Sequence, residues 1–332
     1  MMKQITLAAR PNGMPDASIF RFEEVTLPAV SAGEVQLKGL YYSVDPYMRG
    51  RMNDKKSYSP PFELDKPIVG GVVAEVTTSK DERFAPGDVV LGSYLPWAEE
   101  MVVAADTIRK VDAKLVPPSY YLGVLGMPGL TAYFGLMDIG KPKAGETVVV
   151  SGAAGAVGLV AGQLAKLQGC RVVGIAGSAD KITMLKEEYG FDEAVNYKTD
   201  DLSAAIEKAC PDGVDVYFDN VGGEVSDAVV QHLNFFARVP LCGQIASYND
   251  TAIQMGPRIT PYLLTRSVLM QGFIVRNYVA RFAEGLQYLT PLVAAGKLKY
   301  TETIVEGFDK IPEALLGLFS GKNTGKMIVK VI

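Results

Sequence analysis

The first third of the chain alternates short apolar runs with turns rich in proline, glycine and charged residues. One of these turns, Pro86-Gly87, leads directly into an apolar run. Such runs predict β-strands, and short strands at regular spacing are typical of an antiparallel, barrel-like domain. The predicted strands cover residues 5–10, 20–25, 34–43, 66–76 and 84–92.

From Gly126 onward the pattern changes to apolar strands that alternate with helical periodicity. A helix is predicted over 129–139, and further helices of about ten residues over 180–189 and 201–210. The strands between and after them are predicted at 147–151, 171–176, 193–197, 214–219, 237–242 and 268–274. This alternation indicates βαβ units and a parallel Rossmann sheet.

The end of the chain returns to the first pattern. After a helical stretch at 278–295, a strand is predicted at 301–306, a helix at 311–319 and a last strand at 326–332. We therefore expect an α/β protein in which a Rossmann domain (125–296) is inserted into a smaller, barrel-like domain (1–124 and 297–332).

A turn of small residues joins the first Rossmann strand to its helix. The strand 147–151 runs into Gly152-Ala-Ala-Gly-Ala-Val-Gly158, and an amphipathic helical pattern follows. Small residues let backbone N–H groups approach a pyrophosphate at the helix N-terminus. Ala153 stands where the first glycine of G-x-G-x-x-G is expected, so a simple tight turn is the alternative.

The end of the second Rossmann strand favours NADP(H) over NAD(H). No acidic residue follows Gly177 to bind a ribose 2′-hydroxyl. Ser178 offers a hydroxyl and an N–H group, and Lys181 offers a cation, which together suit a 2′-phosphate. Alternatively, Ser178 caps the next helix and Lys181 lies on the surface; Asp180 keeps NADH open.

Composition excludes several classes of function. The chain has 332 residues, a net charge of −4 and no basic face, so neither nucleic acid nor a membrane surface is expected as a partner. No apolar run approaches the ~18 residues of a membrane span, and we expect no secretory signal. Three cysteines predict a reducing, cytoplasmic setting.

The single histidine, His232, excludes most metal chemistry. A zinc site needs three or four ligands drawn mainly from Cys and His at suitable spacings, which this chain cannot assemble. No G-x-S-x-G motif accompanies His232 for serine–histidine catalysis. With Val229, Val230, Leu233 and Phe236 around it, His232 is interpreted as part of a helix packing face.

Several motifs together resemble the zinc-independent medium-chain dehydrogenases/reductases. The most similar branch contains leukotriene 12-hydroxydehydrogenase/prostaglandin reductase, plant alkenal double-bond reductases and bacterial curcumin reductases. The resemblance covers nearly the whole chain. Its runs begin at Val44 (VDPYMR), Lys66 (KPIVGG), Gly126 (GMPGLTAY), Ala153 (AAGAVG), Phe218 (FDNVGG), Gln271 (QGFIV) and Gly321 (GKNTGK).

The resemblance implies a Rossmann domain inserted in a GroES-like domain, and a homodimer formed through the edge of the Rossmann sheet. It also implies NADPH-dependent reduction of enones and enals at the carbon–carbon double bond, without a metal. Some mammalian members have a tyrosine in the helix before the last Rossmann strand, where 263–267 here has none. The resemblance also implies a set of cofactor contacts, which are Ala154, Gly155, Val157, Ser178, Lys181, Tyr197, Asn220, Cys242, Gly243, Ile245, Ser247, Tyr248, Phe273, Val275 and Asn323.

Hydride transfer to the β-carbon places negative charge on the carbonyl oxygen, and a tyrosine hydroxyl can stabilise it because its usual pKa is about 10. Tyr248 is the first candidate because it ends the loop beside the expected nicotinamide position. Tyr47, in the barrel-like domain, is the second candidate; alternatively, Tyr47 is an aromatic residue of the core. A quinone reductase and a non-catalytic NADPH-binding protein remain alternative functions.

Overall fold

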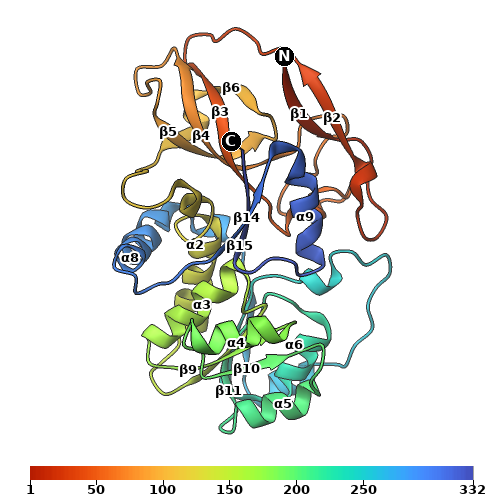
Figure 1. Cartoon of the computed structure of the whole chain (residues 1–332). Coiled ribbons are helices and arrows are strands. Elements are labelled where there is room, and N and C mark those ends of the chain that lie inside the picture. Colours follow the sequence, from red (N-terminus) through yellow and green to blue (C-terminus); the bar gives the residue numbers. More distant parts are fainter. Residues whose placement is uncertain (332) are drawn as a thin grey trace. The chain divides into compact units, whose positions relative to one another are not determined.

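The computed structural model describes residues 1–331, which divide into two compact units. The first unit contains residues 1–122, 302–323 and those from 327 onward. The second unit contains residues 123–301 and 324–326. The chain thus leaves the first unit, builds most of the second and returns to the first (Figure 1).

The first unit consists mainly of antiparallel strands. Within its described residues, one sheet has the order β14-β15-β3-β4-β5-β7, with β6 also paired to β3, and β1 pairs with β2. Its strands are β1 (Met2–Leu7), β2 (Phe20–Val25), β3 (Glu34–Ser43), β4 (Val69–Ser79), β5 (Val89–Pro96), β6 (Glu100–Ala104), β7 (Ile108–Lys110), β14 (Glu302–Glu306) and β15 (Lys326–Lys330). Its helical segments are η1 (Ala17–Ile19), α1 (Met48–Arg51), η2 (Ala105–Thr107), η3 (Pro118–Leu122), η7 (Phe308–Lys310) and α9 (Ile311–Phe319).

The core of the first unit lies between these strands and α9. Val35 and Leu37 of β3 alternate with polar residues and are fully buried, as a strand with one face on a core requires. Ile311 and Leu315, one helical turn apart on α9, pack into the same cluster.

The second unit is built around a parallel sheet with helices in the crossovers (Figure 1). In residues 123–301 the sheet has the order β10-β9-β8-β11-β12-β13, in which β8 and β11 are neighbours at the point where the order reverses. Its strands are β8 (Thr147–Ser151), β9 (Arg171–Ala176), β10 (Glu193–Asn196), β11 (Val214–Phe218), β12 (Leu233–Leu241) and β13 (Leu269–Gly272). Its helical segments are α2 (Met127–Phe134), η4 (Gly135–Gly140), α3 (Ala156–Leu167), α4 (Ala179–Glu187), α5 (Leu202–Ala209), α6 (Gly223–Val230), η5 (Ile245–Ser247), α7 (Thr260–Thr265), η6 (Val275–Arg281) and α8 (Phe282–Ala294).

This strand order is that of the Rossmann fold, in which ligands bind beyond the carboxyl ends of the strands at the reversal point. All five residues of β8 are buried, because helices cover both faces of the sheet centre. The order therefore directs attention to the loops that follow β8 and β11.

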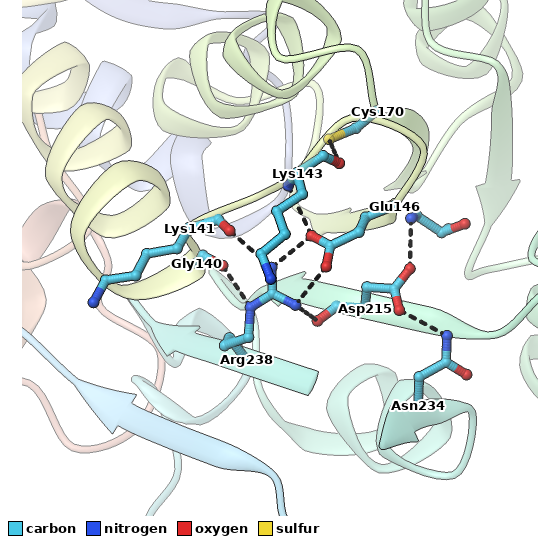
Figure 2. Close-up of polar contacts among 9 residues, drawn as sticks. Gly140, Lys141, Lys143, Glu146, Cys170, Asp215, Asn234 and Arg238 are labelled. Carbon is cyan, nitrogen blue, oxygen red and sulfur yellow. Dashed lines mark hydrogen bonds and ion pairs between the residues drawn. The ribbon is translucent and has the colours of Figure 1, made fainter. Parts of the chain in front are cut away.

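The opposite, amino-terminal end of the same strands is held by a polar cluster around Arg238 of β12 (Figure 2). Its guanidinium donates to the carbonyls of Gly140 (2.8 Å) and Lys141 (2.9 Å) and to both carboxylate oxygens of Glu146 (2.6 and 3.0 Å). Asp215 of β11 accepts from the Thr147 N–H group at 2.8 Å. These bonds join the segment before β8 to β12, and the start of β8 to β11.

Two sequence-based expectations are wrong. His232 does not lie on a helix: α6 ends at Val230, and Leu233 and Phe236 belong to β12. His232 occupies the turn between them, within hydrogen-bond distance of the Ser203 hydroxyl (3.1 Å). The apolar spacing around it resembles helical periodicity, but Phe236 is 71% exposed and faces no core.

The helix before the last Rossmann strand does contain a tyrosine. This helix is α7, which begins at Thr260, three residues earlier than the predicted segment, and therefore includes Tyr262. Pro261 favours the first turn of a helix because its missing N–H group is not needed there, and this signal marks the true start.

Among residues 1–331, no helix is both long enough and apolar enough to cross a membrane.

Candidate functional site

The backbone of the turn between β8 and α3 is closely packed. A Cβ atom on Gly158 would lie 2.3 Å from the carbonyl oxygen of Gly152, so any side chain there would force the backbone to shift. Gly152 itself has φ of +59°, a conformation that favours glycine. The residue with positive φ is thus Gly152 rather than residue 153, so the alanine at 153 does not disturb the turn.

The N-terminus of α3 can bind an anion. Its N-cap, Gly155, offers no side-chain hydrogen bond, and the first helical bond runs from Leu159 N–H to Gly155. The N–H groups of residues 156–158 therefore have no acceptor within the helix, and the dipole of a 12-residue helix adds positive potential there. Ala154 is buried beside this turn, and its carbonyl accepts from Gly325 N–H at 2.8 Å.

Two lysines and a tyrosine lie at the ends of β9 and β10. The ring of Tyr197 covers Gly177, where a Cβ atom would come within 2.6 Å of it. The Lys198 ammonium lies over this ring, 5.9 Å from its centroid. Burial, with a contribution from the charge of Lys198, lowers the pKa of Lys181. Lys198 was not predicted; its place next to Tyr197 in the sequence was the only available signal.

Ser178 caps helix α4. Its Oγ atom accepts from the Lys181 N–H group at 3.4 Å, as one of the two sequence-based interpretations proposed. The cap leaves the hydroxyl hydrogen free to donate, so this role is compatible with anion binding at the same position.

Asp219, directly after β11, is the centre of the site and was not predicted as a functional residue. It is fully buried. Its Oδ1 atom accepts from the hydroxyls of Ser151 (3.0 Å) and Tyr217 (2.9 Å). The same atom accepts from the N–H groups of Val221 and Gly222, both at 2.9 Å. Such a set of donors satisfies the hydrogen-bonding capacity of this buried carboxylate oxygen.

Asn220 joins the end of β11 to the end of β8. Its N–H group donates to the Ser151 Oγ atom at 2.9 Å, and its Nδ2 atom donates to the Ser151 carbonyl at 2.8 Å. The backbone and the side-chain amide of Asn220 are therefore both held at the reversal point of the sheet, beside the glycine turn.

The 242–248 loop is anchored on the same aspartate. The N–H groups of Cys242 and Gly243 donate to the Asp219 carbonyl at 2.8 and 3.1 Å. A Cβ atom on Gly243 would lie 2.9 Å from the Asn220 carbonyl oxygen, so glycine allows the close approach. Burial, aided by the charge of Asp219, raises the pKa of the Cys242 thiol to about 12 and keeps it protonated.

Tyr248 closes this loop. Its Oη atom accepts a hydrogen bond from the Gln244 N–H group at 3.4 Å. Burial raises the pKa of Tyr248, so the phenol stays protonated at neutral pH. Since the oxygen accepts from the backbone, its own hydrogen remains available to a ligand. Ile245 and Ser247 form the short helix η5 just before it.

Phe273 and Val275 follow β13, and both are at least nine-tenths buried. The Phe273 ring packs edge-on against Phe218, with centroids 6.4 Å apart.

The other two predicted site residues belong to the first unit. Asn323 lies in the loop between α9 and β15. Tyr47 precedes α1, packs against the core of the first unit and is hydrogen-bonded to Arg51. Burial, with the charge of Asp45 adding to it, raises the pKa of Tyr47.

Two family models match the chain. The model described as the N-terminal domain of oxidoreductase matches residues 3–111, and the model described as zinc-binding dehydrogenase matches residues 156–290. Despite the second description, no group of three or more His, Cys, Asp or Glu side chains within residues 1–331 is placed to hold a metal ion.

A Bacillus subtilis protein that carries the provisional name of an NADP-dependent oxidoreductase is 59% identical over 332 residues, which cover 99% of this chain and 97% of that protein. The chain belongs to the medium-chain dehydrogenase/reductase family.

Within this family the chain falls in the branch of curcumin, alkenal and prostaglandin reductases, as its motifs predicted. The NADPH-dependent curcumin reductase of Escherichia coli is 44% identical over 98% of this chain and 95% of that protein. The NADP-dependent 2-alkenal reductase of Nicotiana tabacum is 43% identical over 99% of this chain and 97% of that protein.

The crystal structure of CurA from Vibrio vulnificus in complex with NADPH has the same fold as this medium-chain reductase. The TM-score is 0.94 at 43% identity, over 99% of both chains. The predicted fold class, a Rossmann sheet domain combined with an antiparallel domain, is therefore confirmed.

Proposed function

We propose that this medium-chain reductase uses NADPH to reduce the carbon–carbon double bond of α,β-unsaturated ketones and aldehydes. The observation that carries the proposal is the hydrogen-bond network around Asp219. It holds Ser151, which precedes the glycine turn, together with Asn220 and the 242–248 loop at one end of the sheet. The relatives named as curcumin and 2-alkenal reductases support the choice of substrate class.

The residues at this end of the sheet fit the cofactor. The turn at Ala154, Gly155 and Val157, with the free N–H groups of α3, suits the pyrophosphate. Ser178, Lys181 and Tyr197, joined by Lys198, suit a 2′-phosphate, because two cations and a hydroxyl converge there. On the nicotinamide side the proposed contacts are Asn220, Cys242, Gly243, Ile245, Ser247, Tyr248, Phe273 and Val275.

When bound, NADPH supplies a hydride for the β-carbon of the substrate. The carbonyl oxygen then gains negative charge, and the Tyr248 hydroxyl is proposed to donate a hydrogen bond to it. The α-carbon takes a proton from solvent or from this hydroxyl, which completes the addition of two hydrogens across the double bond. Removal of one preorganised donor of this kind typically costs ~10²–10³ in rate.

We assign the first unit to substrate binding and the second to NADPH. Tyr47 is the proposed second catalytic tyrosine, and Asn323 is proposed to contact the cofactor.

We also propose a homodimer formed along β13. This strand is at the edge of the second unit's sheet, and Leu269 on it is 51% exposed. Phe235, Phe236 and Leu264, also in this unit, are 71–81% exposed, and such apolar surface is typical of an interface. A cytoplasmic location is proposed because Cys170, Cys210 and Cys242 are all free thiols.

The test is a panel of an enone, an enal and a para-quinone, each with NADPH and with NADH. We expect NADPH oxidation with the first two, and the saturated ketone or aldehyde as product. Activity on the quinone alone would instead indicate a quinone reductase. NADPH binding without oxidation across the panel would indicate a non-catalytic binding protein.

Tyr248→Phe tests the proposed donor. We expect enone turnover to fall at least about tenfold, with NADPH affinity unchanged, because only the hydroxyl is removed. If turnover stays within about twofold, Tyr248 is not the group that stabilises the oxyanion.

A further inference from the structure

The side chain of Gln244 is tied to Asp219, although Gln244 lies on the exposed part of the 242–248 loop. Its Nε2 atom donates to the Asp219 Oδ2 atom at 3.4 Å. Its amide also fills the space above Gly222: a Cβ atom on Gly222 would lie 2.1 Å from the Gln244 Oε1 atom. The amide is thus confined by packing as well as by its hydrogen bond.

The other end of this link, Asp219, is buried and held by several hydrogen bonds. Asp219 has no exposed surface, and its Oδ1 atom already accepts from four donors of β8, β11 and the turn before α6. Gln244 is therefore bound to a buried side chain that four other hydrogen bonds already hold in place.

The main chain of Gln244 faces Tyr248. Its N–H group donates to the Tyr248 Oη atom at 3.4 Å. Its carbonyl accepts from both the N–H group (3.0 Å) and the hydroxyl (3.1 Å) of Ser247. Displacement of residue 244 would consequently move the one group that is hydrogen-bonded to the Tyr248 phenol within residues 1–331.

We propose that Gln244 is a positioning residue for Tyr248: it transfers the fixed position of Asp219 to the phenol through its own side chain and backbone. The proposal rests on the proposed function, in which the Tyr248 hydroxyl stabilises the substrate oxyanion. Loss of the Gln244 amide loosens the loop and lowers the rate of reduction, while the glycine turn and the lysine pair keep their hold on the cofactor.

Gln244→Leu tests this, because the residue is exposed and leucine removes the amide while keeping a side chain of comparable volume. The matched control is Gln231→Leu, at an exposed glutamine whose side chain donates to the Asp227 carbonyl at 3.2 Å, outside the loop. We expect Gln244→Leu to lower kcat about fivefold, with the Kd for NADPH within about twofold of wild type. Hydrogen–deuterium exchange without cofactor should become faster in the 242–248 peptide, and Gln231→Leu should change neither quantity.

A double-mutant cycle identifies the residue through which Gln244 acts. In a Tyr248→Phe background, Gln244→Leu should cost less than about twofold in kcat, because the group being positioned is already absent. The full cost in that background, or unchanged kcat and unchanged exchange in the single variant, would overturn the proposal. A wild-type enzyme inactive on enones would contradict the proposed function instead, and the exchange measurement would still decide whether Gln244 holds the loop.

Discussion

Replacement of Lys181 or Lys198 by methionine separates the contributions of the two cations beside Tyr197. Lys181 is partly buried near the cap of α4, whereas Lys198 is exposed. A hydrogen bond to a charged group in a partly buried setting contributes about 1.5–3 kcal/mol. An exposed ion pair contributes about 0.2–1 kcal/mol. We therefore expect the Kd for NADPH to rise about 10- to 100-fold in Lys181→Met and at most about fivefold in Lys198→Met.

The assay is fluorescence titration with NADPH and, separately, NADH. Only NADPH carries the 2′-phosphate, so NADH affinity should change by less than about twofold in either variant. The control is Lys186→Met, which removes a lysine of the same helix that pairs with Glu193 at 2.9 Å on the surface. If Lys181→Met weakens both dinucleotides equally, the two lysines do not bind the 2′-phosphate.

The pH dependence gives an independent check on the same pair. In the proposed cofactor site the 2′-phosphate binds the protonated form of Lys181, so we expect NADPH affinity to fall as pH rises through the pKa of this residue. Burial and then the charge of Lys198 lower that pKa. In Lys198→Met the like charge is absent, the pKa of Lys181 rises, and the loss of affinity should move to higher pH. A profile that does not move would refute electrostatic coupling between the two lysines.

Three further substitutions test the glycine turn, the amino-terminal end of the Rossmann sheet and the proposed dimer. Gly158→Ala should cost about 1–3 kcal/mol of stability and weaken NADPH binding, since the new Cβ would meet the Gly152 carbonyl; thermal unfolding and titration measure both. Arg238→Met should cost about 3 kcal/mol and leave the Kd for NADPH unchanged, because it leaves Glu146 unpaired at the far end of the sheet. Burial alone would raise the pKa of Glu146, but the hydrogen bonds from Arg238 and from the Lys143 N–H group, together with the charges of these two residues, outweigh it and lower the pKa. The stabilisation should therefore be lost as pH falls through the folded-state pKa. Leu269→Lys should convert the proposed dimer to monomers in sedimentation experiments, and an unchanged dimer would place the interface elsewhere.

The sequence predicts strands well where burial is complete. Residues 147–151 and 171–176 form β8 and β9 at the predicted bounds, because runs of β-branched residues buried on both faces have no competing local structure. Around His232 the same logic fails. There apolar residues are exposed, Phe236 adopts a φ of +61°, and the strand pairing of β11 and β12 is irregular. The sequence alone does not distinguish apolar residues that lie on the surface from apolar residues that pack in a core.

The candidate site shows the same division. Glycines and strand ends could be placed from local patterns, and so could Ser178 and Lys181. Asp219 could not, because its role depends on hydrogen bonds with Ser151, which is 68 positions away in the chain. Likewise, Gln244 gains its significance only when the loop folds back over Gly222. Contacts between distant segments determine which polar residue of a loop is fixed, and periodicity carries no information about them.

Strand β11 has a carboxylate at each end, and the two have different consequences. Asp215 accepts from Thr147 N–H (2.8 Å) and Asn234 Nδ2 (2.9 Å) and so secures the amino ends of neighbouring strands (Figure 2). Asp219 secures the carboxyl ends and, in addition, the loops that carry Asn220 and Tyr248. Since only one end of a parallel sheet bears the ligand loops, equivalent chemistry stabilises the fold at one end and also organises the site at the other.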